Sequence, residues 1–396
     1  MISQRQLFFK HIGQTSEAPM GLEIERAEGI YLYDTSGKKY IDLIAGVSVS
    51  NVGHLHPEVV KAVQKQAETY MHLMVYGEYI QSPQVEFAKL LIDQLPPKLN
   101  CTYFVNSGSE ANEGAIKLAK RYTGRSEIVA FKNAYHGSTH GAMSLMSDTY
   151  FTQAFRPLLP DIRFLEFNND EDLEQISNKT ACVVIEPVQG EGGVVLPEND
   201  FLTKLRKKCD ETGALLIFDE IQTGFGRTGE LFAFMKYNVV PDIFTVAKAM
   251  GGGMPIGAFV SDKKIMDVFT NNPVLGHITT FGGHPVSAAA ALASLRVLLS
   301  GGIINEVNKK GKYLISLLKH PAIKSIRGTG LFYSVELESA EAVQRFIRLA
   351  IDEGMLTDWF IFLDNRFRIA PPLIISYEEL DLAAVIIKKV LDKISG

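Results

Sequence analysis

The feature that most constrains this chain is the alternation of short apolar runs with amphipathic segments through its middle. Six runs are rich in β-branched and aromatic residues and have the length of buried strands. They cover residues 103–106, 128–131, 181–187, 214–220, 243–248 and 257–261. Residues 110–122 have helical periodicity, with Ala115, Leu118, Ala119 and Tyr122 on one face. This alternation predicts an α/β fold with a mostly parallel sheet between layers of helices.

The length and the end of the chain extend this prediction. A chain of 396 residues exceeds what one compact core usually contains, so we expect one large domain with a smaller companion.

Ser376 and Glu379 have the spacing of a capping box. An apolar stripe follows, formed by Leu380, Ala384, Ile387, Leu391 and Ile394. This pattern predicts a closing amphipathic helix.

Composition and charge exclude several kinds of partner. The net charge of -5 provides no positive surface for nucleic acid or for an anionic membrane. No stretch approaches the roughly 20 apolar residues of a membrane helix, and the first residues lack a secretory apolar region. We therefore expect a cytoplasmic protein with no nucleic acid or membrane partner. Cys101, Cys182 and Cys209 have no metal-ligand spacing, so we expect reduced, buried thiols and no metal site.

Polar and glycine-rich clusters follow five of the predicted strands. They are NSGSEAN (106–112), NAYHGST (133–139), EPVQGEGG (186–193), DEIQTGFGRTG (219–229) and KAMGGG (248–253). In open α/β sheets, ligands bind outside the carboxyl ends of the strands. The five clusters therefore outline one site.

The first cluster has two interpretations. Gly108 and Ser109 precede a predicted helix, whose free N–H groups and dipole favour a phosphate. Ser107 and Glu110 have capping-box spacing, so an ordinary helix cap explains the same residues equally well.

Asp219 and Glu220 end an apolar strand. A buried carboxylate there needs a metal or a cation as its partner, whereas a carboxylate facing water is the commoner case at a strand end. Because no His or Cys lies at metal-ligand spacing nearby, a cationic nitrogen of a heterocycle is the better partner.

Lys248 is the only charged residue of the apolar, glycine-rich run 244–259. An amine in such surroundings loses its proton more readily and becomes a nucleophile toward an aldehyde. A lone lysine at a strand end more often extends to water. Together with a phosphate cradle and a carboxylate for a pyridinium nitrogen, however, Lys248 completes a pyridoxal 5'-phosphate site.

Seven segments of the chain resemble the class III aminotransferases. They are SGSEANEGAIKLAKRYTGR, YHGST, EPVQGEGG, DEIQTGFGRTG, AKAMGGGMPIGA, TTFGGHP and RIAPPL, and the similarity extends from about residue 20 to the C-terminus. The resemblance implies a fold-type I PLP-dependent transferase that is a homodimer with shared active sites. It implies an N-terminal segment (1–50) packed with the small domain, a large PLP-binding domain (51–290) and a smaller α+β domain (291–396).

The resemblance also implies roles for single residues. Lys248 resembles the Schiff-base lysine that shuttles a proton, and Asp219 the partner of the pyridine nitrogen. The other implied cofactor contacts are Gly108 and Ser109 on the phosphate, Tyr135 and Ile221 on the two ring faces, Gln222 on the ring hydroxyl, and Thr280 of the partner subunit on the phosphate. Glu186 matches a position close to the cofactor, and a structural role at the strand end fits it equally well.

Two further residues match the substrate-binding positions of the family. Arg368 resembles the arginine that binds the α-carboxylate of the substrate, and Glu191 resembles its switch partner in the ω-aminotransferases. The chain departs from the family at Ser138, where many members have an arginine that contacts a distal carboxylate.

The resemblance predicts transfer of an amino group from an ω-amine donor, ornithine- or acetylornithine-like, to 2-oxoglutarate by a ping-pong Schiff-base mechanism. Other reactions of the class III scaffold remain open, namely 4-aminobutyrate or other amine transamination, racemisation, decarboxylation and aminomutase chemistry. A catalytically silent binding protein is a weaker alternative, because neither Lys248 nor Asp219 is missing. A plain Rossmann protein is disfavoured, because no early G-x-G-x-x-G lies between a strand and a helix.

Overall fold

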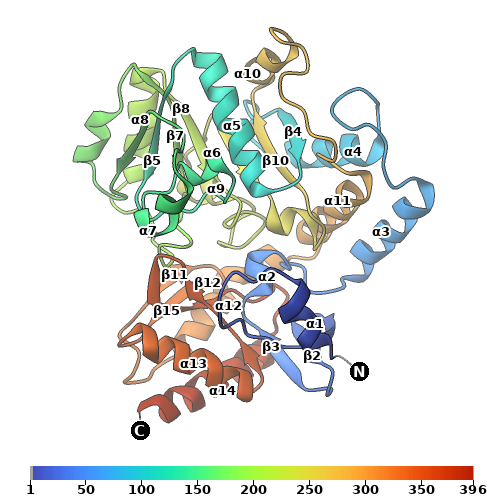
Figure 1. Cartoon of the computed structure of the whole chain (residues 1–396), viewed down its shortest axis with the longest axis vertical. Coiled ribbons are helices and arrows are strands. Elements are labelled where there is room, and N and C mark those ends of the chain that lie inside the picture. Colours follow the sequence, from blue (N-terminus) through green and yellow to red (C-terminus); the bar gives the residue numbers. More distant parts are fainter. Residues whose placement is uncertain (1–2, 396) are drawn as a thin grey trace.

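A computed structural model describes residues 3–395, and its main feature is a seven-stranded sheet in the upper half of Figure 1. The order of the strands is β4-β10-β9-β8-β7-β5-β6. Their bounds are β4 Cys101–Val105, β5 Glu127–Phe131, β6 Ile162–Leu165, β7 Thr180–Ile185, β8 Leu215–Asp219, β9 Ile243–Val246 and β10 Gly257–Ser261. Strand β10 is antiparallel to both of its neighbours, and the other pairs are parallel. The predicted mostly parallel sheet is confirmed.

Helices cover both faces of this sheet. The longer helices of this half are α3 Pro57–Thr69, α4 Ser82–Ile92, α5 Gly108–Thr123, α8 Phe201–Thr212 and α11 Pro285–Ser300. Short helical turns connect the strands: α6 His140–Met143, α7 Thr149–Thr152, η1 Gln153–Phe155, η2 Glu171–Gln175, α9 Ala233–Tyr237, η3 Lys248–Gly251, α10 Lys263–Met266 and η4 Asp267–Thr270.

Helix α5 shows how the sequence determines one of these helices. It begins after Ser107, whose hydroxyl accepts a hydrogen bond from the Glu110 N–H, and it ends at Gly124, whose positive φ of 67° terminates it. Ala115 and Leu118 are buried against the sheet as predicted. Tyr122, which has the same helical spacing, is 47% exposed. It is the penultimate residue of the helix.

Two small sheets form the lower half of Figure 1, where the first and last parts of the chain lie side by side. One sheet has the order β1-β2-β3-β13 and the other β11-β12-β15-β14. Their bounds are β1 Ile24–Glu28, β2 Tyr31–Asp34, β3 Lys39–Asp42, β11 Ser325–Thr329, β12 Phe332–Glu336, β13 Met355–Leu356, β14 Trp359–Phe360 and β15 Leu363–Ile369. Strand β3 pairs in parallel with β13, which joins the N-terminal segment to the C-terminal part.

Three helices accompany the small sheets: α12 Ile303–Leu317 and α13 Ala340–Asp352 contact their strands, and α14 Tyr377–Ser395 packs on these two helices. The predicted capping box of the closing helix α14 is confirmed, because Ser376 Oγ accepts from Glu379 N and Glu379 Oε2 accepts from Ser376 N. Helix α11 crosses the expected boundary between residues 290 and 291, so the domain boundaries stay a prediction. The short α2 Ala45–Ser48 connects the two halves.

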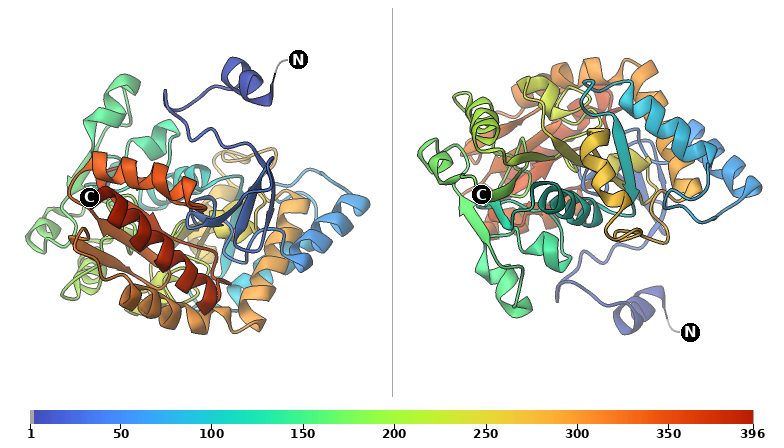
Figure 2. Two further views of the ribbon diagram at one scale, coloured as in Figure 1. Left: turned by 90° about the horizontal axis from the view of Figure 1, so that it is seen from below. Right: turned by 90° about the horizontal axis from the view of Figure 1, so that it is seen from above.

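Helix α1 Gln4–His11 stands apart from the body of the protein in both views of Figure 2 and buries none of its residues. Among residues 3–395, no single helix is long and apolar enough to cross a membrane. Helices α11 and α12 reach that length and composition only as a pair bent by 69°. Cys182 and Cys209 are buried and Cys101 is partly buried, and all three are free thiols.

Candidate active site

A cavity of about 410 Å³ is lined by the clusters that follow the strands of the large sheet. Most of the predicted site residues line it: Gly108, Ser109, Tyr135, Glu186, Asp219, Ile221, Gln222 and Lys248. They come from segments separated by up to 140 residues in the sequence, and the parallel strands bring their carboxyl ends to one edge. The size is that of a small-molecule site.

The N-terminus of α5 forms one wall of the cavity. Ser107 caps the helix through its side chain, so the capping interpretation is right, and Gly108 and Ser109 still line the cavity with the first turn. The first N–H groups of a helix have no intrahelical acceptor, which makes this wall suitable for an anion. A Cβ at Gly108 would lie 2.8 Å from Ile221 Cδ1, so a larger residue would close the gap between this wall and Ile221.

Asp219 is a buried carboxylate held by three donors. Its Oδ2 accepts from Asn112 Nδ2 (2.8 Å) and from His136 Nδ1 (2.7 Å), and its Oδ1 accepts from Ile221 N (3.0 Å). These donors fix the carboxylate and leave it able to accept one more hydrogen bond from a ligand in the cavity.

His136 is a site residue that the sequence analysis did not single out. It lines the cavity and is fully enclosed. Burial opposes its charged form, yet the hydrogen bond and the charge of Asp219 outweigh burial and raise the pKa of His136 above its usual value. The available signal was its place in the strand-end cluster YHGST, directly after Tyr135.

Lys248 lies half-buried at the start of η3, with a positive φ of 47°. Burial lowers the pKa of its amine, and the charges of Glu191 and Asp219 offset only part of that effect. No side-chain hydrogen bond of the described residues contributes to this shift. Lys248 is therefore an amine with a reduced affinity for its proton, next to the carboxylate of Asp219.

Glu186 and Gln222 also line the cavity. Glu186 accepts from Tyr135 N (3.0 Å) and Gly190 N (2.9 Å), and burial raises its pKa to about 7. The Gln222 Nε2 group is buried and has no hydrogen-bond acceptor within residues 3–395. A Cβ at Gly190 would collide with Gln222 Oε1, so glycine there allows the amide to reach the cavity. An unsatisfied amide N–H in a cavity wall favours a ligand with an acceptor oxygen.

Glu220, the neighbour of Asp219, has no place in this cavity. It is fully buried and accepts hydrogen bonds from Thr223 Oγ1, Ala233 N and Phe234 N. Of the two carboxylates at this strand end, Asp219 alone lines the cavity.

Glu191 and Arg368 form a buried ion pair whose charges act on Lys248. Arg368 Nη2 donates to both carboxylate oxygens of Glu191, at 2.9 and 3.0 Å. Burial opposes the ionisation of Glu191, but the Arg368 charge outweighs it, so the pKa of Glu191 lies below its usual value. The pair joins residues 177 positions apart, and neither member is among the residues that line the cavity of about 410 Å³.

Two further positions, one predicted to contact the cofactor phosphate and one that concerns the substrate, lie at the surface. Thr280 is exposed and lines no part of this chain's own cavity. Ser138 is also exposed, and its Oγ lies 3.0 Å from the Tyr135 hydroxyl. The role of Thr280 stays a prediction, because it concerns a second subunit.

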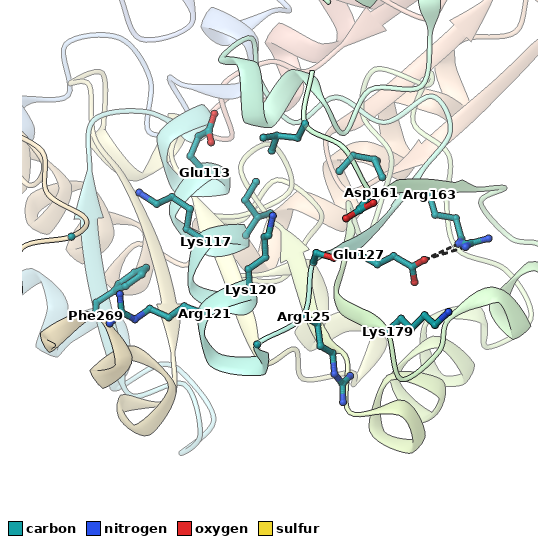
Figure 3. A pocket seen from close by; sticks show the side chains of 16 residues that line it. Glu113, Lys117, Lys120, Arg121, Arg125, Glu127, Asp161, Arg163, Lys179 and Phe269 are labelled. Atoms are coloured by element: carbon teal, nitrogen blue, oxygen red, sulfur yellow. Dashed lines mark hydrogen bonds and ion pairs between the residues drawn. The ribbon is translucent and has the colours of Figure 1, made fainter. Parts of the chain in front are cut away.

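A larger hollow of about 1350 Å³ lies beside α5 and contains none of the predicted site residues. Figure 3 shows that charged side chains line it, among them Arg163, which donates to Glu127 at 3.1 Å. In the part of the chain that the structure describes, no group of three His, Cys, Asp or Glu side chains is arranged to hold a metal ion.

The chain matches the aminotransferase class-III family over residues 12–391. It is 42% identical over 366 residues to the acetylornithine aminotransferase of Methanocaldococcus jannaschii, with 89% of each chain covered. It is 38% identical over 383 residues to that of Methanopyrus kandleri, with 96% of each chain covered.

Solved structures of similar proteins have the same fold. The ornithine aminotransferase of Toxoplasma gondii superposes with a TM-score of 0.91 at 29% identity, covering 100% of this chain and 95% of that one. That structure has partial occupancy of PLP at its active site. An (S)-enantioselective omega-transaminase of Thermomicrobium roseum superposes with a TM-score of 0.91 at 28% identity, covering 99% and 98%.

The cavity of this chain suits pyridoxal 5'-phosphate on its own chemistry. The helix N-terminus matches the phosphate, the Asp219 carboxylate the pyridinium nitrogen, and the unsatisfied Gln222 amide the ring hydroxyl. The lysine amine with a lowered pKa matches the aldehyde. Together with the similarity over nearly the whole chain, this fit shows that the protein belongs to the class III aminotransferases and is a PLP-dependent enzyme.

Proposed function

We propose that this enzyme moves an amino group from an ω-amine donor, acetylornithine- or ornithine-like, to 2-oxoglutarate. The observation that carries the proposal is the buried Glu191–Arg368 pair beside Lys248. Such a site must bind a substrate carboxylate in one half-reaction and an uncharged methylene group in the other. It therefore needs an arginine whose charge is free in the first half-reaction and neutralised by a carboxylate of the protein in the second. The similarity to acetylornithine aminotransferases supports the choice of donor.

The residues of the cavity wall would hold the cofactor. Gly108 and Ser109 would donate their backbone N–H groups to the phosphate, and Tyr135 and Ile221 would pack on the two ring faces. Gln222 Nε2 would donate to the ring hydroxyl. When bound, pyridoxal phosphate supplies an aldehyde for the amine and a ring that accepts electrons from the substrate carbon.

Asp219 would keep a proton on the pyridine nitrogen, and its neighbours ensure that it can. Because His136 Nδ1 and Asn112 Nδ2 both donate to the Asp219 carboxylate, the carboxylate stays in one position in the cavity wall. Glu186, with its pKa raised to about 7 and its oxygens bound to two backbone N–H groups, would form the polar floor of the site.

Lys248 Nζ would act as the proton carrier of the reaction. A general base works best when its pKa lies near the operating pH, and burial moves the pKa of this amine downward in that direction. The positive φ of Lys248 places the side chain at the start of a tight turn, where its backbone is held by buried neighbours.

The visible spectrum of the purified enzyme tests the proposal. We expect an absorption band of bound cofactor that bleaches with N-acetylornithine or ornithine and returns with 2-oxoglutarate, with formation of glutamate. Glutamate formation separates transamination from racemisation, decarboxylation and aminomutase chemistry. The proposal is wrong if no amine donor changes the spectrum and no glutamate forms from 2-oxoglutarate.

We also propose a homodimer in which Thr280 of one subunit reaches the phosphate of the other. Exposed apolar side chains on residues 71–85 and 274–281 support it, because the two segments meet where the rings of His72 and Phe281 lie 4.7 Å apart. Ile80 is 96% exposed, which is unusual for an isoleucine unless another surface covers it.

A further inference from the structure

Arg368 has a second carboxylate partner besides Glu191. Its Nε donates to Asp358 Oδ1 at 2.8 Å, while Nη2 donates to Glu191. The third nitrogen, Nη1, is buried and has no acceptor among the described residues. Two carboxylates therefore share one guanidinium, and each accepts from a different nitrogen of it.

The two carboxylates are attached to the site in different ways. Asp358 lies directly opposite Arg368 in the backbone, since Arg368 N donates to Asp358 O at 2.9 Å. The neighbouring Thr357 Oγ1 donates to Arg368 O at 2.6 Å. Glu191 instead belongs to the loop after β7, and its carboxylate has one further donor, Ile361 N at 3.2 Å. The backbone of Glu191 is held at the end of the same hairpin, where Phe362 N donates to Glu191 O at 3.2 Å. Asp358 is thus paired with Arg368 directly through the backbone, whereas Glu191 contacts Arg368 through its side chain alone.

The ring of Phe360 completes the support of the guanidinium. The Arg368 carbon Cζ lies 4.6 Å from the centre of this ring, which is fully buried. Asp358 and Phe360 flank Trp359 in one short segment that ends in β14. This segment holds Nε and one face of the guanidinium. It leaves Nη2 to Glu191, and Nη1 without an acceptor among the described residues.

The charges imply that one carboxylate must leave when a substrate carboxylate arrives. Two carboxylates and one guanidinium have a net charge of -1, and a third carboxylate in the same buried space would be strongly repelled. We propose that Asp358 is the positioning residue that holds Arg368 by Nε while Glu191 is exchanged for the substrate carboxylate. This inference rests on the proposed function of the Glu191–Arg368 pair.

In this arrangement Asp358 preserves the geometry of the site during the exchange. When Glu191 leaves, Nη1 and Nη2 present two parallel N–H groups to the incoming carboxylate. Without Asp358 the guanidinium would follow Glu191 or rotate, and its Nε would be left without an acceptor. The expected consequence is weaker binding of carboxylate ligands with little change in the chemical step.

The test is binding of glutarate, a dicarboxylate without a reactive carbonyl, to the holoenzyme by titration calorimetry. We expect the Asp358→Ala and Asp358→Leu variants to bind glutarate about tenfold more weakly than the wild type. Asp358→Asn retains an acceptor oxygen for Nε and is expected to bind within about threefold of the wild type. In turnover, KM for 2-oxoglutarate should rise in the first two variants while kcat changes little.

Asp364→Ala is the matched control, because Asp364 is an exposed carboxylate on β15 of the same hairpin. Wild-type glutarate affinity in both Asp358→Ala and Asp358→Leu would overturn the inference. Equal weakening in Asp358→Asn, or in Asp364→Ala, would also overturn it, because the effect would then come from charge or from the hairpin in general. No glutarate binding by the wild type would likewise overturn it. If the wild type binds glutarate but catalyses no transamination, the proposed function is wrong. The role of Asp358 is then still decided by the glutarate affinities of its variants, because that measurement needs no turnover.

Discussion

At the residue scale, the clearest prediction concerns the Lys248 amine. Lys248→Ala removes the group that would hold the cofactor aldehyde and carry the proton, so kcat should fall by at least about a thousandfold. The fold should be unaffected, because the side chain is only half-buried. Amine turnover and the visible spectrum, recorded together on the reconstituted variant, measure the effect. Lys263→Ala removes an exposed lysine and is the control. Residual activity within tenfold of the wild type would contradict the assigned role.

A second prediction at the same scale concerns Glu191, because its substitution should affect the two half-reactions in opposite directions. Glu191→Gln removes the charge that competes with a substrate carboxylate for Arg368. We expect the KM for 2-oxoglutarate to fall about threefold to tenfold. The half-reaction with the ω-amine should slow by a similar factor, because no carboxylate then neutralises the buried Arg368 charge on the side of Glu191. Single-turnover rates of the two half-reactions test this. Glu198→Gln, an exposed residue of the same loop, should change neither. A parallel change of both half-reactions would argue against the switch.

At the scale of an element, Glu220 connects the end of β8 to the start of α9. Its carboxylate accepts from the first N–H groups of α9, those of Ala233 and Phe234, and burial raises its pKa from 4.5 to about 7. Between these values the folded protein retains a proton that the unfolded chain has lost. The stability from this group is therefore present at low pH and is lost as the pH rises through about 7, by about 3 kcal/mol in total.

Glu220→Gln removes this titration. The free energy of unfolding of the variant, relative to that of the wild type, should therefore increase by up to about 3 kcal/mol between pH 5 and pH 8. Urea unfolding at several pH values measures the difference. The control is Glu230→Gln, an exposed carboxylate of the same loop. A difference that is independent of pH would show that Glu220 stays ionised over the whole range.

The elements also show what could be predicted from the sequence. The six predicted strands are present, because a short apolar run that is rich in β-branched and aromatic residues and is bounded by turn residues is typical of a buried strand. Strand β6, Ile162–Leu165, was missed because Arg163 interrupts its apolar run, and at the edge of the sheet that side chain reaches Glu127 at the surface. The antiparallel direction of β10 was also not predictable. All five of its residues are buried, and a uniformly buried strand carries no signal of its direction in the sheet.

At the scale of the whole molecule, the candidate site depends on contacts between distant parts of the chain. Glu191 follows the large sheet and Arg368 belongs to a small one, and no periodicity or spacing brings them together. Their pairing was predictable only from the resemblance to the family. Asp358 and His136 were missed because a single carboxylate or histidine in a loop has no pattern, and only the fold shows what it contacts.

The association of two subunits is the prediction that belongs to this scale. Exposed apolar residues gather on residues 71–85 and 274–281. A hollow of about 280 Å³, lined by Tyr79, Val85 and Gly282, lies along the first of these segments. Ile80→Asp places a charge at the most exposed of these residues and should weaken the dimer at least tenfold, because a buried carboxylate there has no partner. Sedimentation velocity over a range of protein concentrations measures the association.

The same variant should also bind the cofactor more weakly, because each cavity would lose the partner's Thr280 from its phosphate. Val385→Asp makes the same change at an exposed apolar residue of α14, outside both segments, and should leave association and cofactor binding unchanged. Cofactor titration of the dissociated Ile80→Asp protein separates the two effects. If the monomer binds pyridoxal phosphate as tightly as the wild type does, then the cavity of one chain holds the phosphate by itself, and Thr280 has no part in it.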